Sequence, residues 1–267
     1  MVSKSVAGAS TAKTEVSSAS SDSKTQRLQH FWQKYFSFYD TLNESPPYRR
    51  MVQRHAELLQ PSPGDTILDA GAGTGNVTQV LAVRGARVTG VDFCAPALER
   101  CRRKVPAAEF QFADLKHPLP FDTASFDKAA SSLVLHYLTP EQQVFAVGEL
   151  RRVLKPGGPL AITVFATGFK TARVYLETLR DRRRADGVLV TAGLALRYLF
   201  NTARIFYYVW RIKRAEHSGD YRFATADDLV TMLTHGGFDV VSVEPSLAGQ
   251  CWTALARASG VPSVRSV

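Results

Sequence analysis

A glycine-rich segment flanked by two aspartates contains the residue types best suited to bind a small ligand. Gly71, Gly73 and Gly75 alternate with small residues and follow a short apolar segment. Closely spaced glycines let backbone N–H groups approach a ligand, because no Cβ holds it away and positive φ is permitted. Asp69 precedes the glycines, and Asp92 ends a second apolar segment 17 residues after Gly75. An acid at that place can accept both hydroxyls of a ribose, so the pattern predicts a nucleoside site.

Two cofactor classes compete for this arrangement. Dinucleotide-binding loops have the spacing G-x-G-x-x-G, which seats a pyrophosphate. Here Gly71-x-Gly73-x-Gly75 is one residue tighter, and Asp69 would repel a pyrophosphate but attract a cationic amine or sulfonium. The spacing and the charge therefore favour S-adenosylmethionine over a nicotinamide dinucleotide. The intact loop and its two acids also argue against a non-catalytic binding module.

Strands and helices are expected to alternate around this loop. The apolar patterns predict strands over 66–70, 87–92, 110–113, 126–131 and 160–165 and helices over 76–83, 95–104 and 141–154. A late helix over 225–234 precedes two segments, 239–244 and 250–258, that suit an antiparallel pair at a sheet edge. This alternation predicts an α/β fold with a doubly wound, mostly parallel sheet.

The composition divides the chain into segments. Residues 1–25 are rich in Ser, Ala, Thr and Lys and contain no aromatic residue, so we expect a disordered tail. The alternation stops between Thr167 and Asp220, which predicts an inserted helical cap. We expect N-terminal helices closing over the cofactor (26–60), an α/β core (61–166), the cap (167–220), the C-terminal part of the core (221–258) and a tail (259–267).

Over roughly residues 39–258 the chain resembles the class I S-adenosylmethionine-dependent methyltransferases, whose fold is Rossmann-like. The resemblance rests on segments 67–75, 88–92, 112–114, 119–121, 125–127, 131–136 and 150–158. Within that family the chain is most similar to the quinone-biosynthesis C-methyltransferases, on Tyr39-Asp40, Tyr221-Arg222-Phe223 and Gly236-Gly237-Phe238. The strongly basic insertion departs from the pattern of that group.

The resemblance implies a role for each residue of the cofactor site. Asp69 and the loop residues Gly71, Gly73, Thr74 and Gly75 would surround the methionine part. Asp92, with its neighbour Phe93, would hold the ribose, and Asp114, with Ala113 or Leu115, would meet the adenine edge. Ser132 would line the pocket near the methionine end, and the product would be S-adenosylhomocysteine.

Two residues are candidates for direct roles in catalysis. Methyl transfer is an in-line displacement, so a base is needed only if the acceptor must lose a proton. His136 follows the fourth strand and is the candidate base, with a packing role as the alternative. Tyr39 is expected to close over the cofactor, with a core role as the alternative, and for Tyr48 the core role weighs more. The other histidines show no paired spacing, so we expect no metal.

The insertion holds most of the net charge. The chain of 267 residues has a formal charge of +9, and residues 170–214 contain eleven Lys or Arg against three acids, a surplus of +8. Arg197, Arg204 and Arg211 are seven apart and form a basic stripe beside an apolar face. That pattern predicts an interfacial helix and peripheral contact of residues 170–214 with an anionic membrane. The alternative is a lid helix with a solvated arginine ridge, and both imply a large apolar pocket beneath it.

These features favour an apolar or amphiphilic small molecule as acceptor, such as a quinone precursor, a prenylated phenol or a lipid headgroup. The alternative is an RNA methyltransferase. Nucleic acid is disfavoured because Ser131-Ser132-Leu133 stands where base-amine methylating relatives carry an Asn/Asp-Pro-Pro-aromatic signature. The three cysteines have no metal-ligand spacing, and no apolar run reaches about 18 residues, so we expect a cytoplasmic protein. Any association with a membrane would be peripheral and would involve the basic insertion.

Overall fold

The protein is built on one seven-stranded sheet. The structure is a computed structural model and describes residues 40–193, 195, 207 and 223–260. In sequence order the strands are Thr66–Ala70 (β1), Arg87–Asp92 (β2), Glu109–Phe112 (β3), Lys128–Ser132 (β4), Pro159–Phe165 (β5), Phe238–Ser246 (β6) and Cys251–Ala258 (β7). Their order in space is β3-β2-β1-β4-β5-β7-β6. β1 to β5 pair in parallel, and β7 pairs antiparallel with β5 and β6. The predicted doubly wound fold and its antiparallel edge are confirmed.

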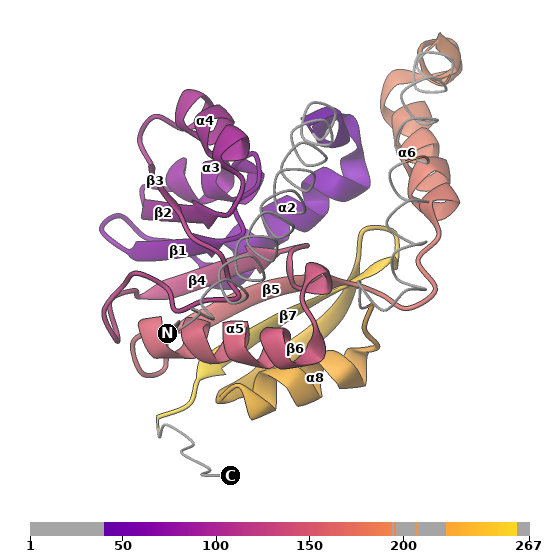
Figure 1. Ribbon diagram of the computed structural model, residues 1–267. Coiled ribbons are helices and arrows are strands. Elements are labelled where there is room, and N and C mark those ends of the chain that lie inside the picture. The colour runs from indigo at the N-terminus through magenta and orange to yellow at the C-terminus, as the bar shows by residue number, and fades with distance from the viewer. Residues whose placement is uncertain (1–39, 194, 196–206, 208–222, 261–267) are drawn as a thin grey trace, which may run out of the picture.

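Helices cover both faces of the sheet. They are Asp40–Glu44 (η1, 3₁₀), Pro46–Leu59 (α2), Asn76–Ala82 (α3), Ala95–Lys104 (α4), Leu135–Tyr137 (η2, 3₁₀), Pro140–Val153 (α5), Thr171–Asp186 (α6) and Ala226–His235 (α8). α2, α3 and α4 lie on one side of the sheet and α5 and α8 on the other, while α6 stands beyond the sheet next to α2 (Figure 1).

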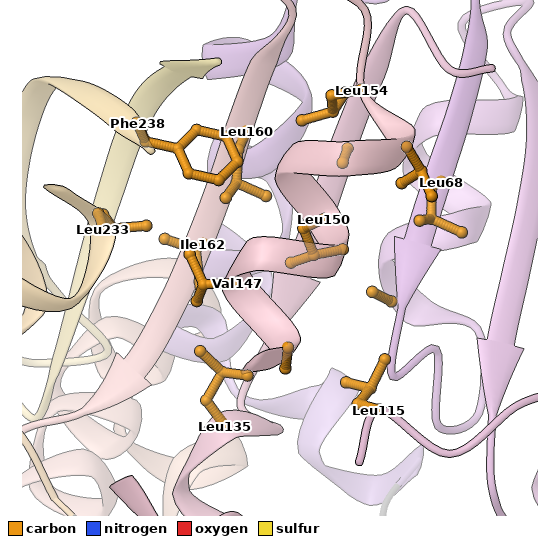
Figure 2. Close-up of a cluster of buried hydrophobic side chains, with 14 of the residues drawn as sticks. Leu68, Leu115, Leu135, Val147, Leu150, Leu154, Leu160, Ile162, Leu233 and Phe238 are labelled. Carbon is orange, nitrogen blue, oxygen red and sulfur yellow. The ribbon is translucent and has the colours of Figure 1, made fainter. Parts of the chain in front are cut away.

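Alternate residues of the central strands pack into opposite layers. Leu68 and Ala129 join the cluster formed with α5 and α8, whereas their neighbours Ile67 and Ala130 join the cluster formed with α2 and α3. Figure 2 shows the first cluster, in which side chains of α5, β5 and α8 gather against β1. Burying one leucine or isoleucine side chain contributes about 1.5–3 kcal/mol, so these two layers hold the strand ends that carry the site in place.

Local signals in the sequence set the ends of α5 and α8. Thr139 caps α5 by accepting the N–H of Gln142, and the Gln142 side chain accepts the N–H of Thr139. Thr225 and Asp228 make the same reciprocal pair at the start of α8. Such capping boxes satisfy backbone donors that lie outside the helical pattern.

The insertion leaves and rejoins the sheet at adjacent points. Thr167 N donates to Ala224 O at 3.0 Å, and Ala224 N donates to Phe165 O at 3.0 Å. The first part of the insertion is α6. The predicted arginine stripe on 195–213, with Arg197, Arg204 and Arg211, lies outside the described residues, apart from 195 and 207.

Other predictions also fall outside the described part of the chain, including the tail over 1–25, the first part of the N-terminal helices over 26–39 and the candidate residue Tyr39. Within that part, no helix has the length and apolar character needed to cross a membrane.

Candidate functional site

A pocket opens at the carboxyl ends of β1, β2 and β4. The strand order runs outward from β1 to β3 on one side and from β4 to β5 on the other, so it reverses between β1 and β4. Ligands of doubly wound sheets bind at such a switch point. The residues that line the pocket are Tyr48, Asp69, Gly71, Ala72, Gly73, Asn76, Val77, Asp92, Phe93, Ser132, Leu133, Val134 and Tyr137. The structure thus brings together six of the predicted cofactor residues, namely Asp69, Gly71, Gly73, Asp92, Phe93 and Ser132.

The glycine loop is held by its own backbone. The N–H groups of Gly71 and Ala72 both donate to Val91 O, at 2.8 and 2.9 Å, which fastens the loop to β2. Gly71 has a φ of 80°, and a Cβ there would lie 2.6 Å from the Val134 side chain. Gly75 has a φ of 78° and stands at the N-cap of α3. These positions need glycine because the backbone is left-handed and, at Gly71, because the pocket wall is too close.

Asp92 is fixed at the end of β2. Its two carboxylate oxygens accept the N–H groups of Gly73 and Cys94, each at 2.9 Å. Burial raises the pKa of Asp92 to about 6, and the hydrogen bonds from the backbone oppose that rise. The group is therefore mostly ionised at neutral pH. A carboxylate has about four lone-pair sites, so Asp92 can accept two further donors from the pocket side.

Asp69 provides a second buried carboxylate on the same pocket wall. One of its oxygens accepts the Thr78 hydroxyl at 2.6 Å. Burial raises the pKa of Asp69 to about 6, the Thr78 hydrogen bonds lower it, and the charge of Asp92 raises it further. Two buried acids in one pocket favour a ligand that brings positive charge and hydroxyl groups.

Asn76, at the start of α3, forms another part of the wall and makes several hydrogen bonds. The sequence analysis did not predict this residue. Asn76 donates from Nδ2 to the Tyr48 hydroxyl at 3.1 Å. Asn76 Oδ1 accepts from Asn43 Nδ2 and from Lys104 Nζ, each at 2.9 Å. The only signal in the sequence is that Asn76 directly follows Gly75 at the start of α3. Tyr48, for which a core role seemed the stronger expectation, is both buried and part of the pocket wall.

A strained residue also lines the pocket and carries no signal in the sequence. Leu133 has a φ of 56°, a left-handed conformation that costs a non-glycine residue energy, and its N–H donates to Thr163 O at 2.9 Å. This turn directs the chain from β4 into Val134, which packs over Gly71.

The predicted adenine residues lie beside the pocket and not in its wall. Ala113 N donates to Asp92 O at 3.2 Å, so the segment after β3 adjoins the end of β2 at Asp92. Asp114, however, accepts the Lys116 N–H at 3.0 Å, and Ala113, Asp114 and Leu115 are not among the lining residues. Thr74 and Gly75 belong to the loop but likewise do not line the cavity.

The structure does not support His136 as a base. His136 lies in η2, is only 1% exposed and is not among the residues that line the pocket. Its ring packs against Tyr137 and Phe165, with centroid distances of 3.7 and 4.7 Å. Burial lowers the pKa of His136 to about 3, which keeps the ring neutral and weakly basic. The packing alternative fits these observations, because η2 directs the His136 side chain towards the rings of Tyr137 and Phe165.

The donor set fits S-adenosylmethionine. The described residues that line the pocket include two buried carboxylates and neither Lys nor Arg. A pyrophosphate would meet both carboxylates without a cation in the wall to offset them, whereas a ribose diol and a sulfonium are suited to them. Asp92 would hold the ribose, and Asp69 with the glycine loop would lie near the methionine part.

The comparisons with known proteins agree with this geometry. A family model for a methyltransferase domain matches residues 67–158. The carboxy-S-adenosyl-L-methionine synthase of Pseudomonas putida is 34% identical over 170 residues, which are 56% of this chain and 67% of that protein. The demethylmenaquinone methyltransferase of Clavibacter sepedonicus is 41% identical over 112 residues, or 41% of this chain and 44% of that one.

The solved structures show the same fold. The N-methyltransferase NodS of Bradyrhizobium japonicum, solved with S-adenosyl-L-homocysteine, is 18% identical with a TM-score of 0.55, covering 82% of this chain and 90% of its own. The chain spans 44–64% of the length of the first three curated relatives it matches. From the domain match, the Pseudomonas putida relative and the geometry of the pocket, we conclude that the chain belongs to the class I S-adenosylmethionine-dependent methyltransferases.

Proposed function

We propose that this protein transfers the methyl group of S-adenosylmethionine to an apolar or amphiphilic small molecule. The observation that carries the proposal is the pair of buried carboxylates, Asp69 and Asp92, at the ends of neighbouring strands in a wall without Lys or Arg among its described residues. The cofactor, when bound, supplies an activated methyl group on a sulfonium. The residues of this chain then bind and orient it and exclude water.

The surroundings of the pocket support an apolar acceptor such as a quinone precursor or a prenylated phenol. Tyr137 lines the cavity and packs on His136, which continues into a cluster of Phe165, Phe169 and Phe223. Aromatic side chains bury large apolar areas and suit planar apolar ligands. The demethylmenaquinone methyltransferase among the relatives is consistent with this class.

A finer part of the proposal is contact between the insertion and an anionic membrane. Arg180, Arg183 and Arg184 on α6 form no ion pair with another described residue. The residues that follow α6, Val188 and Leu189, are 61% and 89% exposed. Exposed aliphatic side chains beside several arginines match an anionic lipid surface, where each basic residue contributes about 1 kcal/mol.

Cofactor binding and the acceptor class are tested separately. Calorimetry should give a measurable dissociation constant for S-adenosylhomocysteine and none for NAD. Incubation with isotopically labelled S-adenosylmethionine and either a lipid extract or total RNA should label the lipid fraction. Label in RNA alone would replace the proposed acceptor class, and binding of NAD alone would contradict the cofactor.

Membrane contact is tested by sedimentation with vesicles of phosphatidylcholine and phosphatidylglycerol. Wild type should sediment with them, and Leu189→Glu should reduce binding at least about tenfold, because a charge replaces an apolar contact. Val83→Glu is the matched control, since Val83 is 82% exposed but lies at the end of α3. A wild type that binds no vesicles, or a control that loses as much, would contradict the membrane contact.

A further inference from the structure

We propose that α6 positions the start of α2 over the cofactor pocket through Ser45 and Arg50, so that the inserted segment controls cofactor affinity. The inference rests on the proposed cofactor site and adds a regulatory role for the insertion. Ser45 and Arg50 are positioning residues in this account, because neither is among the residues that line the pocket.

The segment from Asn43 to Arg50 is held on two sides. On the pocket side, Asn43 donates to Asn76 Oδ1, and the Tyr48 hydroxyl accepts from Asn76 Nδ2. On the other side, the segment meets α6, which packs against α2 (Figure 1). A displacement of this short segment away from α6 would therefore move Tyr48 relative to the pocket.

Ser45 shows that the contact with α6 replaces a local interaction. Ser45 stands at the N-cap of α2, where a serine hydroxyl usually accepts an N–H from the first turn, but it makes no such bond. Its Oγ lies 2.8 Å from Thr178 Oγ1 instead. Thr178 gives its own hydrogen to Val174 O, so Ser45 is the donor in the pair. Thr178 is buried, which makes this hydrogen bond part of the α2–α6 interface.

Arg50 joins the same two helices. Its Nη1 lies 2.7 Å from Asp181 and its Nη2 lies 3.0 Å from Glu177. These acids are two of only three in the basic insertion over 170–214, and the third, Asp186, pairs with Arg182. Arg182 also donates to Glu44 O at 2.9 Å. Two of the three acids of the insertion therefore pair with α2, which points to a brace between the helices.

The link to the cofactor pocket runs through Asn76. Its Oδ1 accepts from Asn43 and Lys104, which fixes the amide so that Nδ2 points to the Tyr48 hydroxyl. Tyr48 and Asn76 both line the pocket. Any acceptor or surface that shifts α6 should thus change cofactor affinity, and bound cofactor should change the position of α6 by the same coupling.

The test compares two arginines on one helix. Arg50→Glu should weaken binding of S-adenosylhomocysteine about two- to fivefold in calorimetry, because exposed ion pairs contribute modestly. Combining Arg50→Glu with Glu177→Arg and Asp181→Arg restores opposite charges and should restore the affinity. Arg54→Glu is the matched control, since Arg54 is also on α2 but pairs with Glu244 of β6 at 2.6 Å. It should leave the affinity within the error of the measurement.

Amide hydrogen exchange of the free protein provides a readout that needs no cofactor. Arg50→Glu should speed exchange of the amides of residues 48–54, since Pro46 and Pro47 carry no amide hydrogen, and the charge swap should reverse the effect. Unchanged affinity and exchange in Arg50→Glu, or an equal loss of affinity in Arg54→Glu, would overturn the inference. If wild type binds no S-adenosylhomocysteine but the exchange results hold, the proposed function fails and the brace between the helices stands.

Discussion

The cofactor pocket and the contact between α2 and α6 are held together in different ways. In the pocket, backbone groups fix the shape: Gly71 and Ala72 bond to Val91 O, and Gly73 and Cys94 bond to the buried Asp92. Polar side chains make the contact with α6, and one of them, Arg50, is more than half exposed. The walls of the pocket are therefore fixed by buried backbone hydrogen bonds, while the contact between α2 and α6 depends on weaker interactions that can adjust.

The largest expected effect is the loss of cofactor affinity when the buried acid of the pocket is removed. Asp92→Ala should weaken binding of S-adenosylhomocysteine about 100-fold or more, because two charge-assisted hydrogen bonds to the ribose are lost. Calorimetry measures the affinity, and circular dichroism checks that the fold is kept. Asp239→Ala, an exposed acid on β6, should leave affinity unchanged. Equal affinity of Asp92→Ala and wild type would remove Asp92 from the ribose site.

The second prediction tests whether the buried charge of Asp69 lowers the stability of the fold while it strengthens cofactor binding. The pKa of Asp69 is raised to about 6 from its ordinary value, so the folded state binds a proton more tightly than the unfolded state. Above pH 6 the buried charge lowers the free energy of unfolding, and Asp69→Asn should recover about 1–3 kcal/mol. The melting temperature at pH 7.5 should rise by roughly 2–8 °C.

The same substitution should weaken binding of S-adenosylmethionine more than that of S-adenosylhomocysteine, because only the former carries a sulfonium. Thr78→Val serves as the control, since it removes the hydrogen bond to Asp69 and keeps the charge. A lower melting temperature for Asp69→Asn would show that the hydrogen bonds of the charged form outweigh the cost of burial.

The smallest expected effect on activity at neutral pH concerns His136. Its ring packs between Tyr137, which lines the pocket, and Phe165 at the end of β5. Its pKa is lowered to about 3, so the unfolded state binds the proton more tightly and wild-type stability falls as pH drops from about 6.5 towards 3. His136→Phe should remove up to about 1.4 kcal/mol per pH unit of that acid dependence, as measured by urea unfolding.

Methyl transfer by His136→Phe at pH 7.5 should stay within about twofold of wild type. A loss of about 100-fold or more with the fold intact would restore the role of His136 as a base. His55, also buried and with a pKa lowered to about 4, bonds to Met51 O and lies near Thr163. It therefore provides a contrast at pH 7.5, where both rings are neutral, because His55→Phe should destabilise the protein through the loss of these hydrogen bonds.

Much of the fold and half of the cofactor site follow from local sequence patterns. The predicted bounds of β1, β2 and α4 coincide with the structure, because apolar periodicity and glycine turns determine them within a few residues. Asp69, the glycines and Asp92 were found for the same reason. β4 begins two residues later than expected, since Phe126 makes only an isolated bridge to Leu154 before regular pairing starts.

Contacts between distant residues could not be predicted in this way. Tyr48 meets Asn76 across 28 positions, and Arg50 meets Glu177 across 127, so no periodicity marks either pair. The buried position of His136 could not be predicted either, because its place after β4 says nothing about the turn at Leu133 and η2, which directs its side chain inward.

The closeness of Thr167 and Ala224 has a consequence for engineering this protein. Thr167 and Ala224 are joined by a hydrogen bond, and the two segments run parallel there. A loop long enough to turn back on itself could therefore replace the residues between them without disturbing the register of β5. Recombination at these two positions therefore offers a way to exchange the insertion while the strands that carry the pocket are kept. Any transplanted piece would have to supply its own partner for Arg50.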